Sequence, residues 1–106
     1  MKKDNVYLKH ILDAISDIEK FMQGVSEEQF FGNKEKQYAV LRGLEIIGEA
    51  TKNLSVELKA KSSDVDWKNI ACLFWRESTF GLGAVKKDVP QLKKQASKML
   101  KNFNNT

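Results

Sequence analysis

The stretch that decides the fold is Arg42-Gly43-Leu44-Glu45-Ile46-Ile47-Gly48-Glu49-Ala50-Thr51-Lys52-Asn53-Leu54-Ser55. Apolar residues recur through it, and beyond both of its ends, at steps of three or four. This spacing lays side chains along one line of an α-helix, where they face a hydrophobic core. The residues of this apolar stripe are Val40, Leu44, Ile47, Thr51, Leu54 and Leu58.

A polar stripe runs along the opposite side of the same predicted helix. It consists of Tyr38, Arg42, Glu45 and Glu49, which the 100° turn per residue brings to one side. Opposite charges at such spacings commonly form ion pairs within the helix on a solvated face. The alternative is that the stripe lines a cleft or binds a partner. The spacing alone leaves both interpretations open.

Three segments of the chain resemble the HepT-like toxins of the HEPN superfamily. Residues 39–52 are similar to the central segment of that family, and a helix led by Trp67 follows them as it does in the family. Residues 7–15 and 86–92 resemble the family's opening and closing segments. In total the resemblance covers residues 5–73 and 84–101.

The resemblance implies a toxin that cleaves RNA without a metal, pairs as a homodimer and is neutralised by a nucleotidyltransferase antitoxin. The family signature is an Arg, four to six residues, a His, one residue and a Tyr. The His can move protons near neutral pH, while the Arg stabilises charge on the scissile phosphate. In the family the central helix lines the dimer region, so the resemblance places Arg42, Glu45 and Glu49 in a cleft or partner-binding surface.

This sequence lacks the signature. Family spacing would put the Arg at Phe74 and the His at Thr79. The only His is His10, in the first predicted helix, and we interpret it as a packing or surface residue. We therefore assign no catalytic residue, and Arg76 is the single basic residue of the segment that could substitute. A degenerate homologue, an engineered variant or a reading-frame disturbance across residues 73–83 would each leave this pattern.

Composition predicts one helical domain, residues 1–106. The chain has 106 residues, one Pro, six Gly and 42% hydrophobic residues. No apolar run approaches the roughly 18 residues that cross a bilayer, and the start is no apolar signal segment. We therefore expect a cytoplasmic protein without a membrane partner. The single cysteine, Cys72, has no second Cys or His cluster, so we expect a buried thiol, no metal and no cofactor.

The net charge of +4 is unevenly distributed. Residues 84–106 contain six Lys against Asp88, a balance of +5, which leaves −1 for residues 1–83. Such a basic helix could meet nucleic acid phosphates. It could equally present a solvated lysine face, which we favour because no aromatic or Arg residue interleaves to stack on bases. The lysines in question are Lys93, Lys94, Lys98 and Lys101.

The predicted fold class is all-α, an up-and-down bundle of four to five helices like that of HEPN proteins. Gly24 is placed to end the first helix in a left-handed conformation. Ser26 and Gln29 match a capping box, which starts a short helix with Phe30 and Phe31 packing inward. The longer predicted helices are residues 4–23, 34–59, 67–75 and 84–103.

Pro90 lies inside the last predicted helix, where it removes one backbone donor. This predicts either a kink near residues 86–89 or a helix that starts at Pro90. The expected core face of that helix is Val85, Val89, Leu92, Ala96, Leu100 and Phe103.

Two functions from different classes follow. The first is an endoribonuclease toxin, implied by the resemblance. The second is a dimeric helical module without catalysis that binds a partner protein or a nucleotide, favoured by the missing signature. We expect a homodimer because Phe74, Trp75 and Phe80 leave apolar surface near one end. Expected partners are a second copy, a cognate nucleotidyltransferase antitoxin and RNA.

Overall fold

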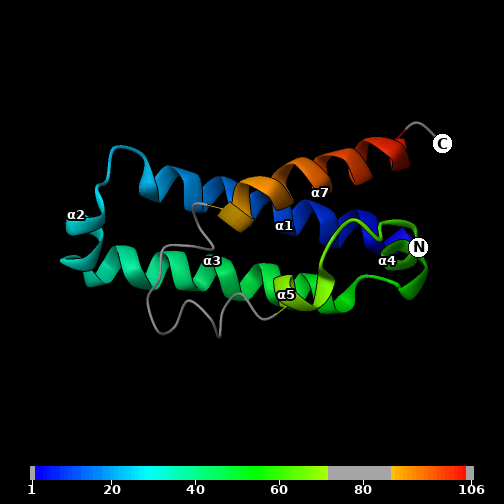
Figure 1. Cartoon of the computed structure of the whole chain (residues 1–106), viewed down its shortest axis with the longest axis horizontal. Helices are drawn as coiled ribbons and strands as arrows, with labels where there is room; N and C mark the ends of the chain where they lie inside the picture. The colour runs from blue at the N-terminus through cyan, green and yellow to red at the C-terminus, as the bar shows by residue number, and fades with distance from the viewer. Residues whose placement is uncertain (1, 72–86, 105–106) are drawn as a thin grey trace.

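The computed structural model describes residues 2–71 and 87–104, and every regular element in these ranges is helical, with residues 87 and 88 π-helical and the rest α-helices. This confirms the all-α prediction. The helices are α1 (Lys2–Met22), α2 (Glu27–Phe31), α3 (Lys34–Asn53), α4 (Val56–Lys61), α5 (Trp67–Ala71) and α7 (Val89–Asn104) (Figure 1). Across the described ranges, no helix is both long enough and apolar enough to span a bilayer.

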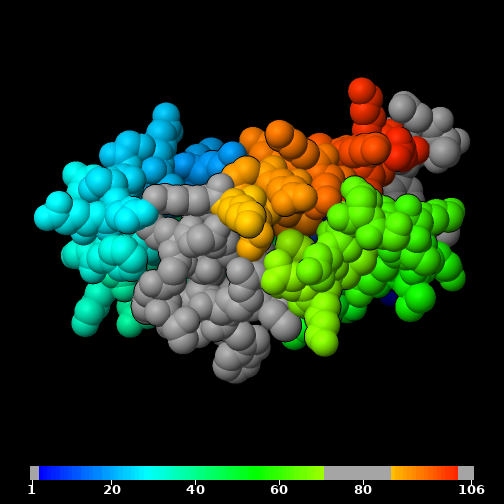
Figure 2. All heavy atoms as spheres, viewed as in Figure 1, coloured from blue at the N-terminus to red at the C-terminus, as the bar shows by residue number. Residues whose placement is uncertain are grey.

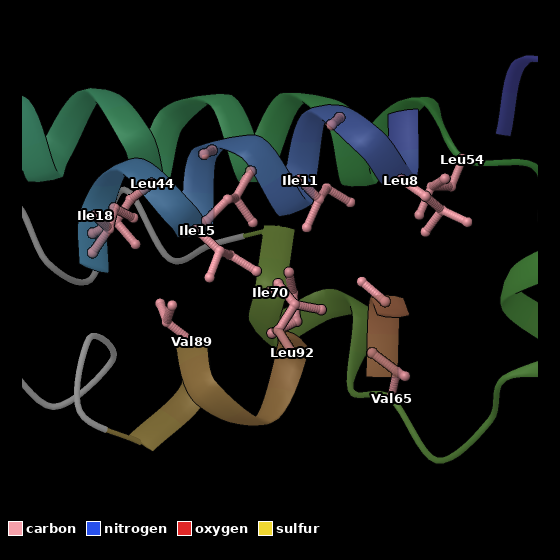
Figure 3. Packing of buried hydrophobic residues seen from close by; sticks show 14 of the residues in the cluster. Leu8, Ile11, Ile15, Ile18, Leu44, Leu54, Val65, Ile70, Val89 and Leu92 are labelled. Carbon is pink, nitrogen blue, oxygen red and sulfur yellow. The ribbon is translucent and has the colours of Figure 1, made fainter. Parts of the chain in front are cut away.

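α1 and α3 form the main pair of the bundle. They run antiparallel, with α2 closing one end, and α7 lies along α1 with its last turns near the N-terminus (Figure 1). α5 packs against α3. One continuous hydrophobic core lies between these helices, to which α1 contributes Leu8, Ile11, Ile15 and Ile18 facing Ile70, Val89 and Leu92 (Figure 3).

The apolar stripe predicted on α3 is buried as expected. Val40, Leu44, Ile47 and Thr51 are each at most 2% exposed. α1 and α3 pack closely at Gly43, where an added Cβ would lie 2.7 Å from Cγ1 of Ile18. A larger residue at position 43 would force the Ile18 side chain or one of the helices to shift.

The turn between α1 and α3 follows the sequence prediction closely. Gly24 has a φ of +71°, a left-handed conformation that glycine adopts at little cost. Ser26 caps α2 in a capping box: its Oγ accepts from the Gln29 N–H, and Gln29 Oε1 accepts from the Ser26 N–H. Phe30 is buried, but Phe31 is 48% exposed, so the prediction that both rings pack inward was half wrong.

The predicted helix over residues 34–59 was wrong in its length, because the chain breaks at Leu54 and Ser55. α3 ends at Asn53, and Ser55 becomes the N-cap of α4, accepting from the Leu58 N–H at 3.2 Å. Leu54 and Leu58 remain buried on the two sides of the break. The three- and four-residue spacing of buried apolar residues therefore continues past Asn53, although α3 ends there.

The break between α3 and α4 contacts a buried carboxylate near the start of the chain, that of Asp4. Asp4 is 2% exposed and accepts two hydrogen bonds from Ser55, one from the N–H at 2.8 Å and one from Oγ–H at 2.6 Å. Burying a carboxylate is costly unless its lone pairs are satisfied. Ser55 thus fixes the first turn of α1 against the end of α3.

The last helix begins at Val89, so Pro90 is its second residue. Proline is tolerated in a first turn, where its missing N–H has no helical partner. The α-helix thus starts within one residue of Pro90, as in the second alternative, and the π-helical residues 87 and 88 before it lie where the first alternative placed a kink. Val89, Leu92 and Ala96 are buried as predicted, whereas Val85 and the side chain of Phe103 lie outside the described residues.

We predict that Ser55→Ala lowers the free energy of unfolding by about 2–3 kcal/mol. About 1 kcal/mol comes from the lost helix cap, and the rest from a buried carboxylate left short of a donor. The matched control is Ser26→Ala, which removes a cap at an exposed site and should cost about 1 kcal/mol. Equal losses in urea unfolding would show that the Asp4 contact contributes nothing.

Candidate functional site

The polar stripe of α3 lies on the outer side of the bundle. Tyr38 is 68% exposed, and the side chains of Arg42, Glu45 and Glu49 are 68%, 40% and 67% exposed. Leu44 and Ile47 lie a third to a half of a turn around the α3 axis from the charged residues of the stripe, and both face the core. The charged side chains therefore point outward. The two stripes of one helix thus have opposite environments.

The charges of this stripe are paired along α3. Nη1 of Arg42 donates to Oε1 of Glu45, three residues on. Nζ of Lys52 lies 3.8 Å from Oε1 of Glu49, again at a spacing of three. The stripe itself holds one cation and two anions, and Lys52 beside it balances the remaining negative charge. Such exposed pairs contribute little to stability, at most about 1 kcal/mol each.

This geometry is that of a solvated stripe in the single chain. A cleft or a partner surface would need a second molecule against it, so the assignment of Arg42, Glu45 and Glu49 to such a surface stays a prediction. Tyr38 and Arg42 give the stripe one aromatic ring and one guanidinium, the side chains most enriched at protein interfaces.

His10 is exposed on α1 and lies edge-on to Tyr7, with ring centroids 6.1 Å apart and planes at 83°. Arg42, on α3, is bonded to Glu45. In the described parts of the chain, neither residue bonds to the other. The one histidine and the one arginine among the described residues are therefore not joined in one site, and Arg76 lies outside those residues.

The residues of the altered signature cannot be placed. Phe74, Thr79 and Arg76 lie outside the described residues, as do Cys72 and the aromatic residues Trp75 and Phe80. The prediction about Arg76 therefore stays a prediction. Over residues 2–71 and 87–104, no three His, Cys, Asp or Glu side chains gather to hold a metal ion.

Besides the Asp4–Ser55 contact, sequence reasoning missed an ion pair between α1 and α7. Nζ of Lys93, on α7, donates to Oε1 of Glu19, on α1, at 2.9 Å. A shallow hollow opens beside this pair, where Ser16 and Lys20 of α1, and Gln23 just after it, meet Val89 and Pro90 of α7. No local pattern could have indicated a pair 74 residues apart.

The comparison with protein families agrees with this arrangement of helices. The family model described as "Ribonuclease HepT-like" matches residues 11–73, which is more than half of the chain. The matched range contains both stripes of α3 and the whole of the α1–α3 pair except the first turns of α1. The chain therefore belongs to the HepT-like ribonuclease family.

Curated relatives support the same family. A protein of Methanocaldococcus jannaschii named "Gamma-glutamylcyclotransferase and putative RNase" is 41% identical over 118 residues, covering 99% of this chain and 53% of that protein. A "Probable ribonuclease HepT" of Thermococcus cleftensis is 36% identical over 103 residues, covering 90% of this chain and 94% of that protein.

A third relative, a "Putative RNase" of Caldanaerobacter subterraneus subsp. tengcongensis, is 36% identical over 108 residues, covering 94% of this chain and 96% of that protein. The chain thus spans about half the length of the first relative and nearly all of the other two. No solved structure matches the chain.

We predict that, for the single chain at concentrations well below those at which it would dimerise, Glu45→Gln changes the free energy of unfolding by less than about 0.5 kcal/mol, because the ion pair it breaks is exposed there. Asp13→Asn, an exposed acid on α1, is the control and should have an effect of similar size. Thermal unfolding monitored by circular dichroism measures both. A loss of 2 kcal/mol or more for Glu45→Gln alone would contradict a solvated stripe.

Proposed function

We propose that this chain is the HepT-like component of a prokaryotic toxin–antitoxin pair that keeps the helical scaffold and its partner surfaces but cleaves RNA weakly or not at all. The observation that carries the proposal is the absence of the Arg-His-Tyr signature from a chain that otherwise belongs to the family. Its one histidine lies on α1, beside Tyr7.

The chemistry explains why this loss matters. Metal-independent cleavage of RNA needs a group that moves protons at the ribose 2′-OH and a cation that stabilises the phosphate as charge develops. His10 is an exposed residue without an arginine bonded to it, and Arg42 already pairs with Glu45. General acid–base catalysis alone typically contributes about 10²–10⁴-fold in rate.

The proposed partners are a second copy of the chain and a nucleotidyltransferase antitoxin. The α3 stripe of Tyr38, Arg42, Glu45 and Glu49 is the proposed contact surface. Its support is composition and position: a row with one Tyr and one Arg, whose charges are balanced once Lys52 is included, carried by the central helix of the family resemblance. A complementary surface would let the ion pairs rearrange across the interface.

Family membership favours a second function, an active endoribonuclease that works without the usual signature. The two proposals differ in one measurable property, the cleavage of RNA in the absence of metal.

We predict no cleavage of a labelled single-stranded RNA above the buffer background when the purified protein is incubated with it in EDTA. The reason is that no His–Arg pair stands at the family spacing. His10→Ala and Arg76→Ala are the control variants and should behave like the unmodified protein. Cleavage that either substitution abolishes would establish the second function and overturn the first.

We also predict a homodimer at tens of micromolar, with a mass by light scattering of twice the chain's 12.1 kDa. Arg42→Ala should raise the dimer dissociation constant at least about tenfold, because truncating a buried ion pair leaves its mate unpaired. Lys34→Ala, an exposed cation at the start of α3, is the control. A monomer mass, or equal constants for both variants, would remove the stripe from the interface.

A further inference from the structure

α7 carries a row of exposed lysines on the side opposite its core face. Positions 91, 94, 98 and 101 follow one another at steps of three and four, so they share one side of α7, and Lys87 lies in the π-helical residues directly before the helix. All five are exposed, while Val89, Leu92, Ala96 and Met99 are buried on the other side. We call Lys87, Lys94, Lys98 and Lys101 the lysine stripe.

The charges of the lysine stripe are free. Lys93, at the flank of α7, is the lysine that pairs with Glu19 of α1. Within the described ranges, Lys87, Lys94, Lys98 and Lys101 have no carboxylate partner. Asp88 is the only acidic residue from position 84 to the end of the sequence. α7 runs along one edge of the molecule, where its outer side is open (Figure 2).

We propose that the lysine stripe binds the phosphate backbone of RNA without reading its base sequence. Lys ammonium groups neutralise phosphates and release counterions, which supplies affinity independent of sequence. The stripe has no Arg and no aromatic ring for stacking on bases, so it can position a strand but not select one. The choice of RNA as the nucleic acid rests on the proposed function.

An acidic protein partner fits this surface less well than RNA does. Protein interfaces are depleted in Lys and take their energy from buried aromatic and Arg anchors. The exposed large apolar residues of the described chain, Val6, Phe21, Phe31, Tyr38 and Val56, belong to α1–α4 and not to α7. The lysine stripe therefore offers charge without an apolar anchor.

The stripe also has the length that a strand needs. Within α7 the stripe runs from Lys94 to Lys101, two turns of helix that rise about 10 Å at 1.5 Å per residue. Contacts with three phosphates of a single strand predict a slope of about −2 in log K against log salt, at roughly 0.7 per phosphate.

The test is fluorescence anisotropy of a short labelled single-stranded RNA of mixed sequence, titrated with the full chain. The affinity of the unmodified protein should fall about 20-fold between about 50 mM and 200 mM salt. The triple variant Lys94→Gln, Lys98→Gln and Lys101→Gln should bind at least about tenfold more weakly at the lower salt and lose most of the salt dependence. Gln keeps the helix propensity of these exposed positions.

The matched control is the triple variant Lys34→Gln, Lys61→Gln and Lys68→Gln, which removes the same charge from exposed positions on α3, α4 and α5. Its affinity should stay within twofold of the unmodified protein. Equal weakening by both triple variants would mean that net charge alone governs binding, and would overturn the proposal. The proposal would also be overturned if no RNA binding were seen at the lower salt, or if a polyglutamate peptide bound more tightly than RNA.

This result is separable from that of the proposed function. The anisotropy assay measures binding and needs no cleavage, and the lysine variants leave the α3 stripe intact. RNA cleavage in EDTA would overturn the proposed loss of activity while leaving the lysine stripe in place. Undiminished binding by the α7 variant, with no cleavage, would overturn only the lysine stripe.

Discussion

The close approach of α1 and α3 at Gly43 is the constraint on which the rest of the structure depends. Because position 43 has no side chain, Ile18 can pack directly against the backbone of α3. The apolar stripe of α3 then reaches the row of leucine and isoleucine side chains on α1 (Figure 3). Each such side chain contributes about 1.5–3 kcal/mol when fully buried, and the pair supplies nine of the eighteen buried hydrophobic residues of the described core, to which α5 and α7 add theirs.

This contact also decides which residues can be functional. Once Leu44 and Ile47 face α1, the 100° step of the helix fixes Arg42, Glu45 and Glu49 on the outside. They cannot turn inward without exposing the apolar stripe, at a cost of several kcal/mol. Any role for them must therefore come from a molecule that approaches α3, which is why we propose a contact surface there and not a preformed pocket.

The parts of the fold that local sequence determines were predictable, and the parts that long-range contacts determine were not. Gly24 and the capping box of Ser26 and Gln29 act within a few residues, and both appear as expected. The break after Asn53 depends on Asp4, 51 residues away from Ser55. It was hidden because Leu54 and Leu58 stay buried on either side of it. The Arg42–Glu45 pair follows from spacing, whereas a cleft depends on a second molecule.

The α3 stripe and the lysine stripe differ in charge, and this difference bears on RNA binding separately from RNA cleavage. The charges of the α3 stripe have partners on the same helix, Lys52 included, while the lysine stripe holds positive charge without a carboxylate partner among the described residues. Affinity for a polyanion depends on the number of phosphates neutralised and is spread over several lysines. Catalysis depends on one His and one Arg held at a fixed geometry, so losing either removes most of it. Our two proposals are therefore compatible: the loss of the nuclease signature does not remove the charge that we propose binds RNA.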